Sequence, residues 1–451
     1  MSKYKTEVYL ASTIITALPA LKDHRILRLI TLALLYVAQG LPIGLFQVAI
    51  PAWLAAEGLS AAEVGGFIAI AFLPWSFKLL AGPIMDRFSF PPMGRRRPWV
   101  IAAQACIVLS LVLIAIVAPD PLSQLGLLAG LGFVANAFGA IQDVAVDGMA
   151  IDILEENERA QANAFMFGGQ VTGMSGSAAL GSYALTNFGL GPAALILAMI
   201  VALIMLVPLL MRERPGERLL PWTNGAPSEE ALASVSEKWS EIFSPLIRAL
   251  ILPMSVLLVL LEALNRMSAG ILQAIGPVIT VQELGWSQAD FAGWIAVTGI
   301  AAAVFGVILG PIVDRYGAKI TLTIMVGIRM LLFLATGFFE SYWQDAFLVK
   351  GVILIMALTG QIVTIAIISM FMRISFKRVA ATQFAVYMAL ANLGLSMGAA
   401  LVAPMDGLLD YSQMFYVTAA LNALFLVLWP LVDMDRHSSD MAALENKQFR
   451  S

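Results

Sequence analysis

Long apolar runs separated by short polar breaks extend from residue 27 to residue 433 of this 451-residue chain. The hydrocarbon core of a bilayer is crossed by about 20 mostly apolar residues in a helix, because a helix satisfies its own backbone polar groups. The runs predict twelve membrane-spanning helices, at residues 27–54, 61–84, 98–118, 122–149, 160–184, 191–211, 249–281, 288–313, 320–339, 346–371, 380–404 and 412–433. The pattern therefore predicts an all-α polytopic membrane protein.

Two stretches of the first half of the chain recur in the second half. AGPIMDRF at 81–88 returns as LGPIVDRY at 309–316, and GLFQVAIP at 44–51 resembles GILQAIGP at 270–277, at displacements of 228 and 226 residues. Two parallel six-helix pseudo-repeats are therefore expected. The predicted units are an N-terminal interfacial segment, a first bundle, a linker, a second bundle and a tail, at 1–26, 27–211, 212–248, 249–433 and 434–451.

Charge is scarce and unevenly placed. Hydrophobic residues make up 60% of the chain and charged residues 13%, against about a quarter charged in soluble domains. All but four of the 27 Lys and Arg lie in alternate loops or at the helix ends next to them. The four exceptions fall inside predicted spans and are Lys78, Arg266, Arg329 and Lys350, of which Lys350 lies near an outer helix end. Because basic loops stay in the cytoplasm, both termini and the linker are expected there, with residues 1–26 uncleaved. A net charge of -3 argues against a nucleic-acid partner.

Few residues capable of covalent chemistry lie in the apolar body. The chain has one cysteine, Cys106, and two histidines, His24 and His437, which fall in the polar tails. No disulfide framework, thiolate metal site or histidine metal site is therefore expected. The sequence shows neither a paired nucleophile and base nor a G-x-x-x-x-G-K-[ST] phosphate loop. We expect no metal, no cofactor and no enzymatic activity.

Two acids lie four residues apart on the fourth predicted span. Asp143 and Asp147 share one helix face, and the rise from Leu122 puts Asp143 in the cytoplasmic third of the bilayer. Both acids can pair with Lys78 or with the loop at 95–97. For Asp147 this pairing is the favoured reading, whereas for Asp143 a proton-binding or solute-binding role is equally compatible with the sequence.

A second charged pair lies near the bilayer midplane. Glu262 and Arg266 are four residues apart, in the favourable order for an ion pair. One interpretation is a pair that neutralises itself. The favoured one is that Glu262 binds a proton, which releases Arg266 to hold an anionic solute. Arg329, inside the ninth span, either supports Glu262 or reaches the interface.

Polar uncharged residues also lie within the spans. They can line a polar cavity or bridge neighbouring helices. The set includes Tyr36, Gln39, Gln47, Trp75, Asn136, Asn265, Gln273 and Asn392.

The repeated G-P-[IV]-x-D-R-[FY] motif resembles the signature that follows the second helix in major facilitator transporters. Its acids and bases at the cytoplasmic helix ends are expected to form a gating latch that breaks and re-forms as the halves rock. The alternative is that these charges only fix the topology. The latch residues are Asp86, Arg87, Arg95, Arg96, Asp147, Asp314 and Arg315.

The first half also resembles one family, the AmpG-type muropeptide permeases and related acetyl-coenzyme A transporters. The matching pieces, in family order, are QGLPIGL (39–45), FLPWSFKLLAGPIMDRF (72–88), GRRRPW (94–99) and QDVAVDG (142–148). By this resemblance Lys78 occupies the family's lysine before the signature, and Gln142, Asp143 and Asp147 occupy its Q-D-x-A-x-D motif. The resemblance implies proton-driven movement of bulky polar solutes.

These observations predict a secondary transporter, a monomer in a bacterial inner membrane that imports a small molecule with protons. An anhydromuropeptide is the favoured solute. A ferric siderophore and an acetyl-coenzyme A-like conjugate are the alternatives, and a non-transporting assembly or sensor protein of the same fold is a further one. The proton-coupling and solute-binding residues are predicted to be Lys78, Gln142, Asp143, Glu262, Arg266 and Arg329.

Overall fold

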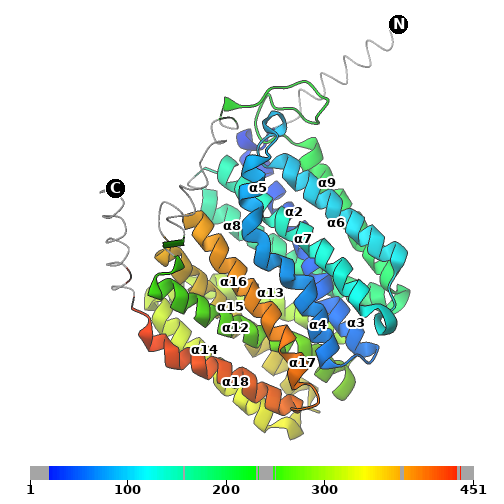
Figure 1. The fold of residues 1–451 in the computed structure, drawn as a ribbon, viewed down its shortest axis with the longest axis vertical. Coiled ribbons are helices and arrows are strands. Elements are labelled where there is room, and N and C mark those ends of the chain that lie inside the picture. Colours follow the sequence, from blue (N-terminus) through cyan, green and yellow to red (C-terminus); the bar gives the residue numbers. More distant parts are fainter. Residues whose placement is uncertain are drawn as a thin grey trace.

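A computed structural model describes residues 20–155, 158–229, 232, 247–248, 250–375, 380–433 and 437, and these are almost entirely helical (Figure 1). The first half contains α2 (Arg25–Gly44) with η2 (Leu45–Ala49) and α3 (Ile50–Ala56), α4 (Ala61–Phe72) with η3 (Leu73–Leu80) and α5 (Ala81–Arg87), α6 (Arg97–Val117), α7 (Pro121–Ile153), α8 (Arg159–Phe188) and α9 (Leu190–Leu210). The second half contains α12 (Pro253–Val278) with η6 (Ile279–Glu283), α13 (Gln288–Tyr316), α14 (Ala318–Phe338), α15 (Ala346–Ile374), α16 (Ala380–Ala400) with α17 (Val402–Met405), and α18 (Tyr411–Leu428).

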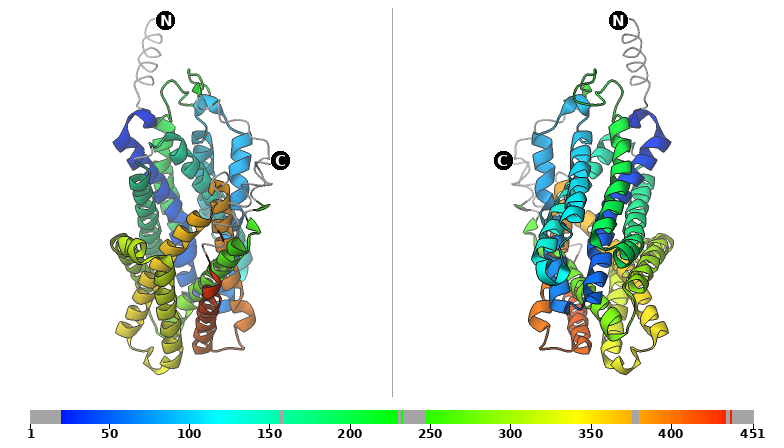
Figure 2. Two further views of the ribbon diagram at one scale, coloured as in Figure 1. Left: turned by 90° about the vertical axis from the view of Figure 1, so that its left-hand side faces the viewer. Right: turned by 90° about the vertical axis from the view of Figure 1, so that its right-hand side faces the viewer.

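The two halves lie side by side as bundles of long helices (Figures 1 and 2). Eleven helical segments of the described chain are long and apolar enough to cross a membrane. The remaining predicted span, the fifth, is α8, which is 30 residues long but more polar, and it packs between α2 of its own half and α13 of the other. The predicted fold class is confirmed.

Glycines allow the same close helix crossing in both halves. A Cβ at Gly173 of α8 would lie 2.2 Å from the Val37 carbonyl oxygen of α2, and a Cβ at Gly398 of α16 would lie 2.1 Å from the Met267 carbonyl oxygen of α12. Small residues let membrane helices approach until their backbones touch. The internal repeat therefore extends to the packing of the first and fifth helices of each half.

The second predicted span is not a regular helix. Its middle, η3, is a 3-10 segment of eight residues that begins next to Pro74. Proline removes a backbone donor and clashes with the preceding turn, and a 3-10 stretch inside a helix is typical of hinges and strained sites. Lys78 lies on this irregular segment.

One end of the bundle, which we call the closed end, is held together by hydrogen bonds between the halves. The Gln282 Nε2 donates to the carbonyl oxygens of Ala55 and Leu59, both at 2.8 Å. The Ala62 N–H donates to Asp406 at 3.1 Å. Near these contacts α4 packs on α16 and α17. The halves therefore meet tightly where the first span ends and the second begins.

At the opposite end, residues 211–228 fold onto the first half. Glu213 is fully buried and accepts the backbone N–H groups of Arg95, Arg96 and Arg97 at the start of α6. Burial raises the pKa of Glu213. Burial, and next the negative charge of Glu213, raise the pKa of Glu217 to about 7. The beginning of the predicted linker thus packs against the first bundle. Other parts of the predicted terminal and linker units lie outside the described residues. These parts are 1–19, 230–231, 233–246, 434–436 and 438–451.

Candidate functional site

Lys78 and Asp143 form an ion pair inside the first half. The Lys78 Nζ lies 2.8 Å from the Asp143 Oδ2, and the Gln39 Nε2 donates to the Asp143 Oδ1 at 2.6 Å. These residues come from η3, α7 and α2, so three spans meet at one carboxylate that is 5% exposed. We call Gln39, Lys78 and Asp143 the α7 cluster. A buried acid is tolerated when a cation and donors replace its water, and the cluster supplies both.

Trp75 fixes the surroundings of Lys78. Its indole Nε1 donates to the Asn136 Oδ1 at 2.9 Å, and the Lys78 Nζ lies 5.9 Å from the centre of its ring. The Trp75 carbonyl oxygen accepts a hydrogen bond of 3.4 Å from the Asn392 Nδ2 of α16. The second half therefore touches the irregular segment that holds Lys78.

Asp147 has a different partner from the one the sequence favoured. The Tyr36 hydroxyl of α2 donates to the Asp147 Oδ1, whereas we expected Lys78 or the loop at 95–97 to pair with this acid. The neighbouring Gln142 Nε2 donates to the Leu35 carbonyl oxygen at 2.8 Å. This face of α7 turns toward α2 rather than toward the basic loop, which explains the difference.

Arg95 and Arg96 instead approach Asp152, at the end of α7. The Arg95 Nη1 lies 3.5 Å and the Arg96 Nε 3.9 Å from its carboxylate oxygens. A Cβ added to Gly148 would lie 2.6 Å from the Arg96 Nε, so Arg96 lies directly over the α7 backbone. Asp152 was not singled out from the sequence, although its place nine residues after Asp143 on the same helix was visible there.

The other latch residues do not come together in what the structure describes. Arg87 and Arg315 have exposed side chains, and the Arg315 guanidinium lies 5.8 Å from the Tyr316 ring centre. The side chains of Asp86 and Asp314 lie outside the described part of the chain. The latch therefore stays a prediction.

Glu262, Asn265 and Arg266 form a second buried cluster on α12. The Arg266 Nε donates to the Glu262 Oε1 at 2.7 Å, and the Asn265 Nδ2 donates to the Glu262 Oε2 at 3.0 Å. Glu262 is 3% exposed, whereas the Arg266 side chain is 24% exposed. The acid thus lies behind its more accessible cation, in the ion pair that the i, i+4 spacing allows.

Arg329 of α14 completes this group. Its Nη1 donates to the Asn265 Oδ1 at 3.2 Å, and its guanidinium lies 5.6 Å from the Phe333 ring centre. Arg329 is 5% exposed, and no carboxylate of a described residue lies within ion-pair distance of it. We call Glu262, Asn265, Arg266 and Arg329 the α12 cluster. It contains two guanidinium groups and one carboxylate.

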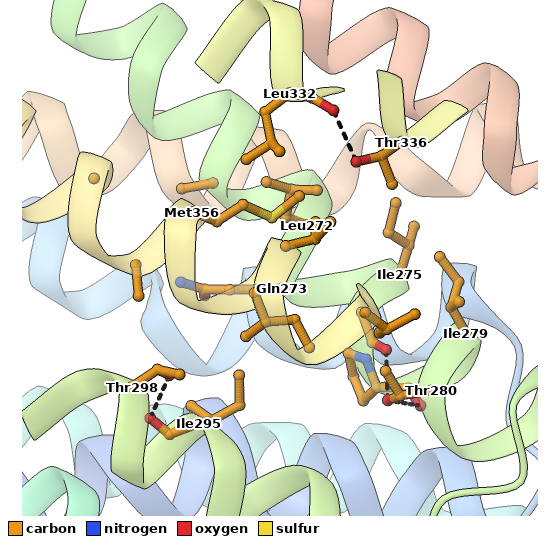
Figure 3. Close-up of a pocket in the computed structure, with 18 of the residues that line it drawn as sticks. Leu272, Gln273, Ile275, Ile279, Thr280, Ile295, Thr298, Leu332, Thr336 and Met356 are labelled. Carbon is orange, nitrogen blue, oxygen red and sulfur yellow. Dashed lines mark hydrogen bonds between the residues drawn. The ribbon is translucent and has the colours of Figure 1, made fainter. Parts of the chain in front are cut away.

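A cavity of about 730 Å³ is lined in part by Asn265, Arg266 and Arg329 of the α12 cluster. Figure 3 shows other residues of its wall. Most of its wall comes from α12, α13, α14 and α15, with η2 and α8 contributing from the first half. Arg266 and Arg329 are its charged lining residues, and much of the rest is apolar, including Leu272, Ile275, Ile279, Ile295, Leu332 and Met356. This volume is typical of sites for small organic molecules. Glu262 and the α7 cluster are not part of the wall.

The two clusters face each other across the interface between the halves. Arg266 lies close enough to Lys78 for their charges to repel. The sequence had singled out five charged residues in the spans and predicted the Glu262–Arg266 pair, but it left open the partners of the others, which are Lys78, Asp143 and Arg329. Of the amide partners, Gln39 is the first residue of the family piece QGLPIGL, whereas Asn265 stood among many other polar residues without a distinguishing signal.

Known proteins resemble the chain over much of its length. An anhydromuropeptide permease of Escherichia coli strain K12 is 24% identical over 376 residues, which cover 80% of this chain and 71% of the permease. An uncharacterized protein of Haemophilus influenzae is 32% identical over 124 residues, 28% of each chain, so the chain spans little more than a quarter of that relative. The crystal structure of the nucleoside transporter NupG matches with a TM-score of 0.69 at 11% identity, over 90% of this chain and 98% of NupG.

The family model of the Major Facilitator Superfamily matches residues 32–399 and 258–450. Together with the helical fold and the named relatives, this confirms the resemblance to major facilitator and AmpG-type permeases. It also confirms a multi-pass membrane protein related to transporters. The chain belongs to the Major Facilitator Superfamily.

Proposed function

We propose that the chain imports a bulky anionic solute, such as an anhydromuropeptide, together with protons. The observation that carries the proposal is the second guanidinium of the α12 cluster, next to the cavity. A cation buried in the membrane interior is costly when no acid neutralises it. An anionic solute in the cavity would supply the missing negative charge. The permease of Escherichia coli provides the solute class by its name.

Proton coupling is assigned to Glu262. Glu262 is 3% exposed and accepts a hydrogen bond from the Arg266 Nε at its Oε1, so a proton and this guanidinium compete for the same oxygen. Protonation at Oε1 removes the acceptor of the 2.7 Å bond from the Arg266 Nε. Arg266 then turns to the solute, and the ion pair re-forms when the solute and the proton leave. Asp143 and Lys78 repeat the arrangement of a buried acid behind a cation in the first half.

The proposed orientation of the chain in the membrane is based on the charge distribution. The end with Arg25, Arg95–Arg97 and Arg212 is assigned to the cytoplasm, because basic loops remain there, and the closed end faces outward. The central segment and both termini are then cytoplasmic, and the Asp86 and Asp314 motifs act as latches on that side.

The membrane potential supplies energy for the proposed import. A potential of about 100 mV contributes about 2.3 kcal/mol for each proton that enters, which is enough for a roughly fifty-fold accumulation of the solute.

The test is uptake of radiolabelled anhydromuropeptide by vesicles that contain the full chain under an imposed inward proton gradient. We expect Glu262→Gln, Asp143→Asn or both to abolish accumulation, while the protein still inserts normally. Asp290→Asn is the matched control, because this exposed acid at the start of α13 bonds only to Ser287 among the described contacts. Accumulation at the wild-type level in both test variants would refute proton coupling through these acids.

A further inference from the structure

Gln47 and Gln273 join the two halves at the cavity wall. The Gln47 Nε2 donates to the Gln273 Oε1 at 2.9 Å. Gln47 lies on η2 of the first span and Gln273 on α12, and both line the cavity. Gln273 lies between Leu272 and Met356 on one side and Ile295 and Thr298 on the other (Figure 3). The pair is thus a neutral polar contact in a largely apolar wall.

The two residues are counterparts in the internal repeat. Gln47 is the fourth residue of GLFQVAIP at 44–51, and Gln273 is the fourth residue of GILQAIGP at 270–277. In an arrangement with two-fold symmetry, a residue touches its own counterpart only at the axis. The amide pair therefore marks the pseudo-two-fold axis between the halves, where a solute moving through the centre must pass.

Gln273 also has a fixed relation to the charged part of the cavity. It lies seven residues after Arg266, which is two helical turns, so both side chains leave α12 on the same face. Their separation along the helix is roughly 10 Å. The wall therefore presents a cation at one level and a neutral donor and acceptor about 10 Å further along.

We propose that the Gln47–Gln273 pair recognises a neutral hydrogen-bonding group of the solute, a hydroxyl or a carboxamide, held about 10 Å from the anionic group at the α12 cluster. This inference rests on the proposed function and names a second recognition element of the same cavity. A carboxamide has both donors and acceptors, so a hydroxyl or amide of the solute can replace the bond between the two glutamines. An alkyl group cannot, and leaves two amides without partners.

Leucine substitutions distinguish recognition of the solute by the two glutamines from a purely structural contact that holds the halves together. Gln47→Leu and Gln273→Leu each leave one amide unpaired, so both single variants should lower the apparent Tm and raise the KM. The double variant removes both amides, and replacing both partners of a hydrogen bond by apolar groups is nearly neutral for stability. The double variant should therefore regain the wild-type Tm. Its KM should stay about tenfold higher than that of the wild type, because losing one or two hydrogen bonds to the solute weakens binding by about this factor.

The KM is measured as exchange of labelled for unlabelled anhydromuropeptide across vesicle membranes without a proton gradient. Exchange needs no proton coupling, so failure of the coupling mechanism leaves this comparison intact. Gln288→Leu is the matched control, because its Nε2 bonds to the Thr186 hydroxyl across the same interface, at 2.5 Å, but neither residue lines the cavity. It should change the Tm and leave the KM unaltered. A KM that returns to the wild-type value together with the Tm in the double variant overturns the inference.

A second measurement does not depend on the identity of the transported solute. The full chain in detergent is heated with 6-acetamidohexanoate or with nonanoate, which has the same length and charge but no amide. We expect the amide compound to raise the apparent Tm of the wild type more than nonanoate does, and this advantage to vanish in the double leucine variant. Equal protection by the two compounds in the wild type refutes amide recognition, even if anhydromuropeptide is transported.

Discussion

Gly65 lies where α4 of the first half crosses the second half, and alanine at this position should open the closed end. A Cβ at Gly65 would lie 2.5 Å from the Ala399 carbonyl oxygen and 3.1 Å from the Ala274 Cβ. Both neighbours belong to the other half, and the nearer one is backbone, which cannot rotate away. The two halves must separate locally to accept the new methyl group.

The expected magnitude follows from the cost of overpacking a tight contact. An extra methyl group in a well-packed site costs about 1–3 kcal/mol. Because the contact exists only while this end is closed, this cost is paid by the closed conformation alone. At 1.4 kcal/mol per factor of ten, the equilibrium should shift toward opening by roughly 5- to 150-fold.

The assay is the rate at which a maleimide alkylates Ala55→Cys in a Cys106→Ser background. Ala55 is 1% exposed, and its carbonyl oxygen accepts a hydrogen bond from Gln282 of the other half. A cysteine there should react slowly in the closed conformation and faster in proportion to opening.

Two glycines provide controls for the change in helix propensity. A Cβ at Gly66 or at Gly293 would meet nothing within 4 Å, and Gly293 occupies the position 228 residues after Gly65 in the repeat. Gly66→Ala and Gly293→Ala should leave the alkylation rate unchanged. If Gly65→Ala reacts no faster than these two, the backbone contact does not limit opening and the reasoning is refuted.

The remaining predictions concern the buried charges. Lys78→Met leaves Asp143 buried with the Gln39 amide as its remaining donor among the described bonds, so it should destabilise the fold by about 3–5 kcal/mol. Lys78→Met with Asp143→Asn should recover most of this loss in thermal unfolding, and an equal Tm for the single and double variants would contradict the ion-pair argument. The pKa of Glu217 is raised from 4.5 to about 7, so folding takes up a proton in this window and the loop at 211–228 loses stability as the pH rises through it. This loop should resist proteolysis better at about pH 5 than at about pH 8, and Glu217→Gln should reduce the difference. A pH dependence as large in the variant would exclude Glu217 as its cause.

Much of the architecture could be predicted because membrane insertion is decided locally. The twelve predicted spans agree with the observed helices within a few residues at most ends. The start of α12 and the ends of α7 and α8 differ from the predicted bounds by four residues. Span length depends on the apolar run itself and on bilayer thickness. The Glu262–Arg266 pair was predictable for the same reason, since i and i+4 are neighbours on any helix. The 3-10 segment at 73–80 was not predicted, although Pro74 was visible in the sequence.

Contacts between distant parts of the chain could not be predicted in the same way. Lys78 and Asp143 are 65 residues apart, and Arg329 and Asn265 are 64 apart. Asp147 shows the difficulty, because an acid near a basic loop also lies near Tyr36, and only the rotation of α7 selects between them.

The sequence by itself determined the number of spans, the repeat and the presence of costly charges in the apolar body, because each depends on residue type within one helix or on direct comparison of two stretches. Only the tertiary structure decided that Arg329 lies beside the Glu262–Arg266 ion pair at a cavity without an ion pair of its own among the described residues, and that Gln47 meets its own repeat counterpart. Those features depend on how helices from both halves rotate and pack, and the cavity is the volume that this packing leaves unfilled.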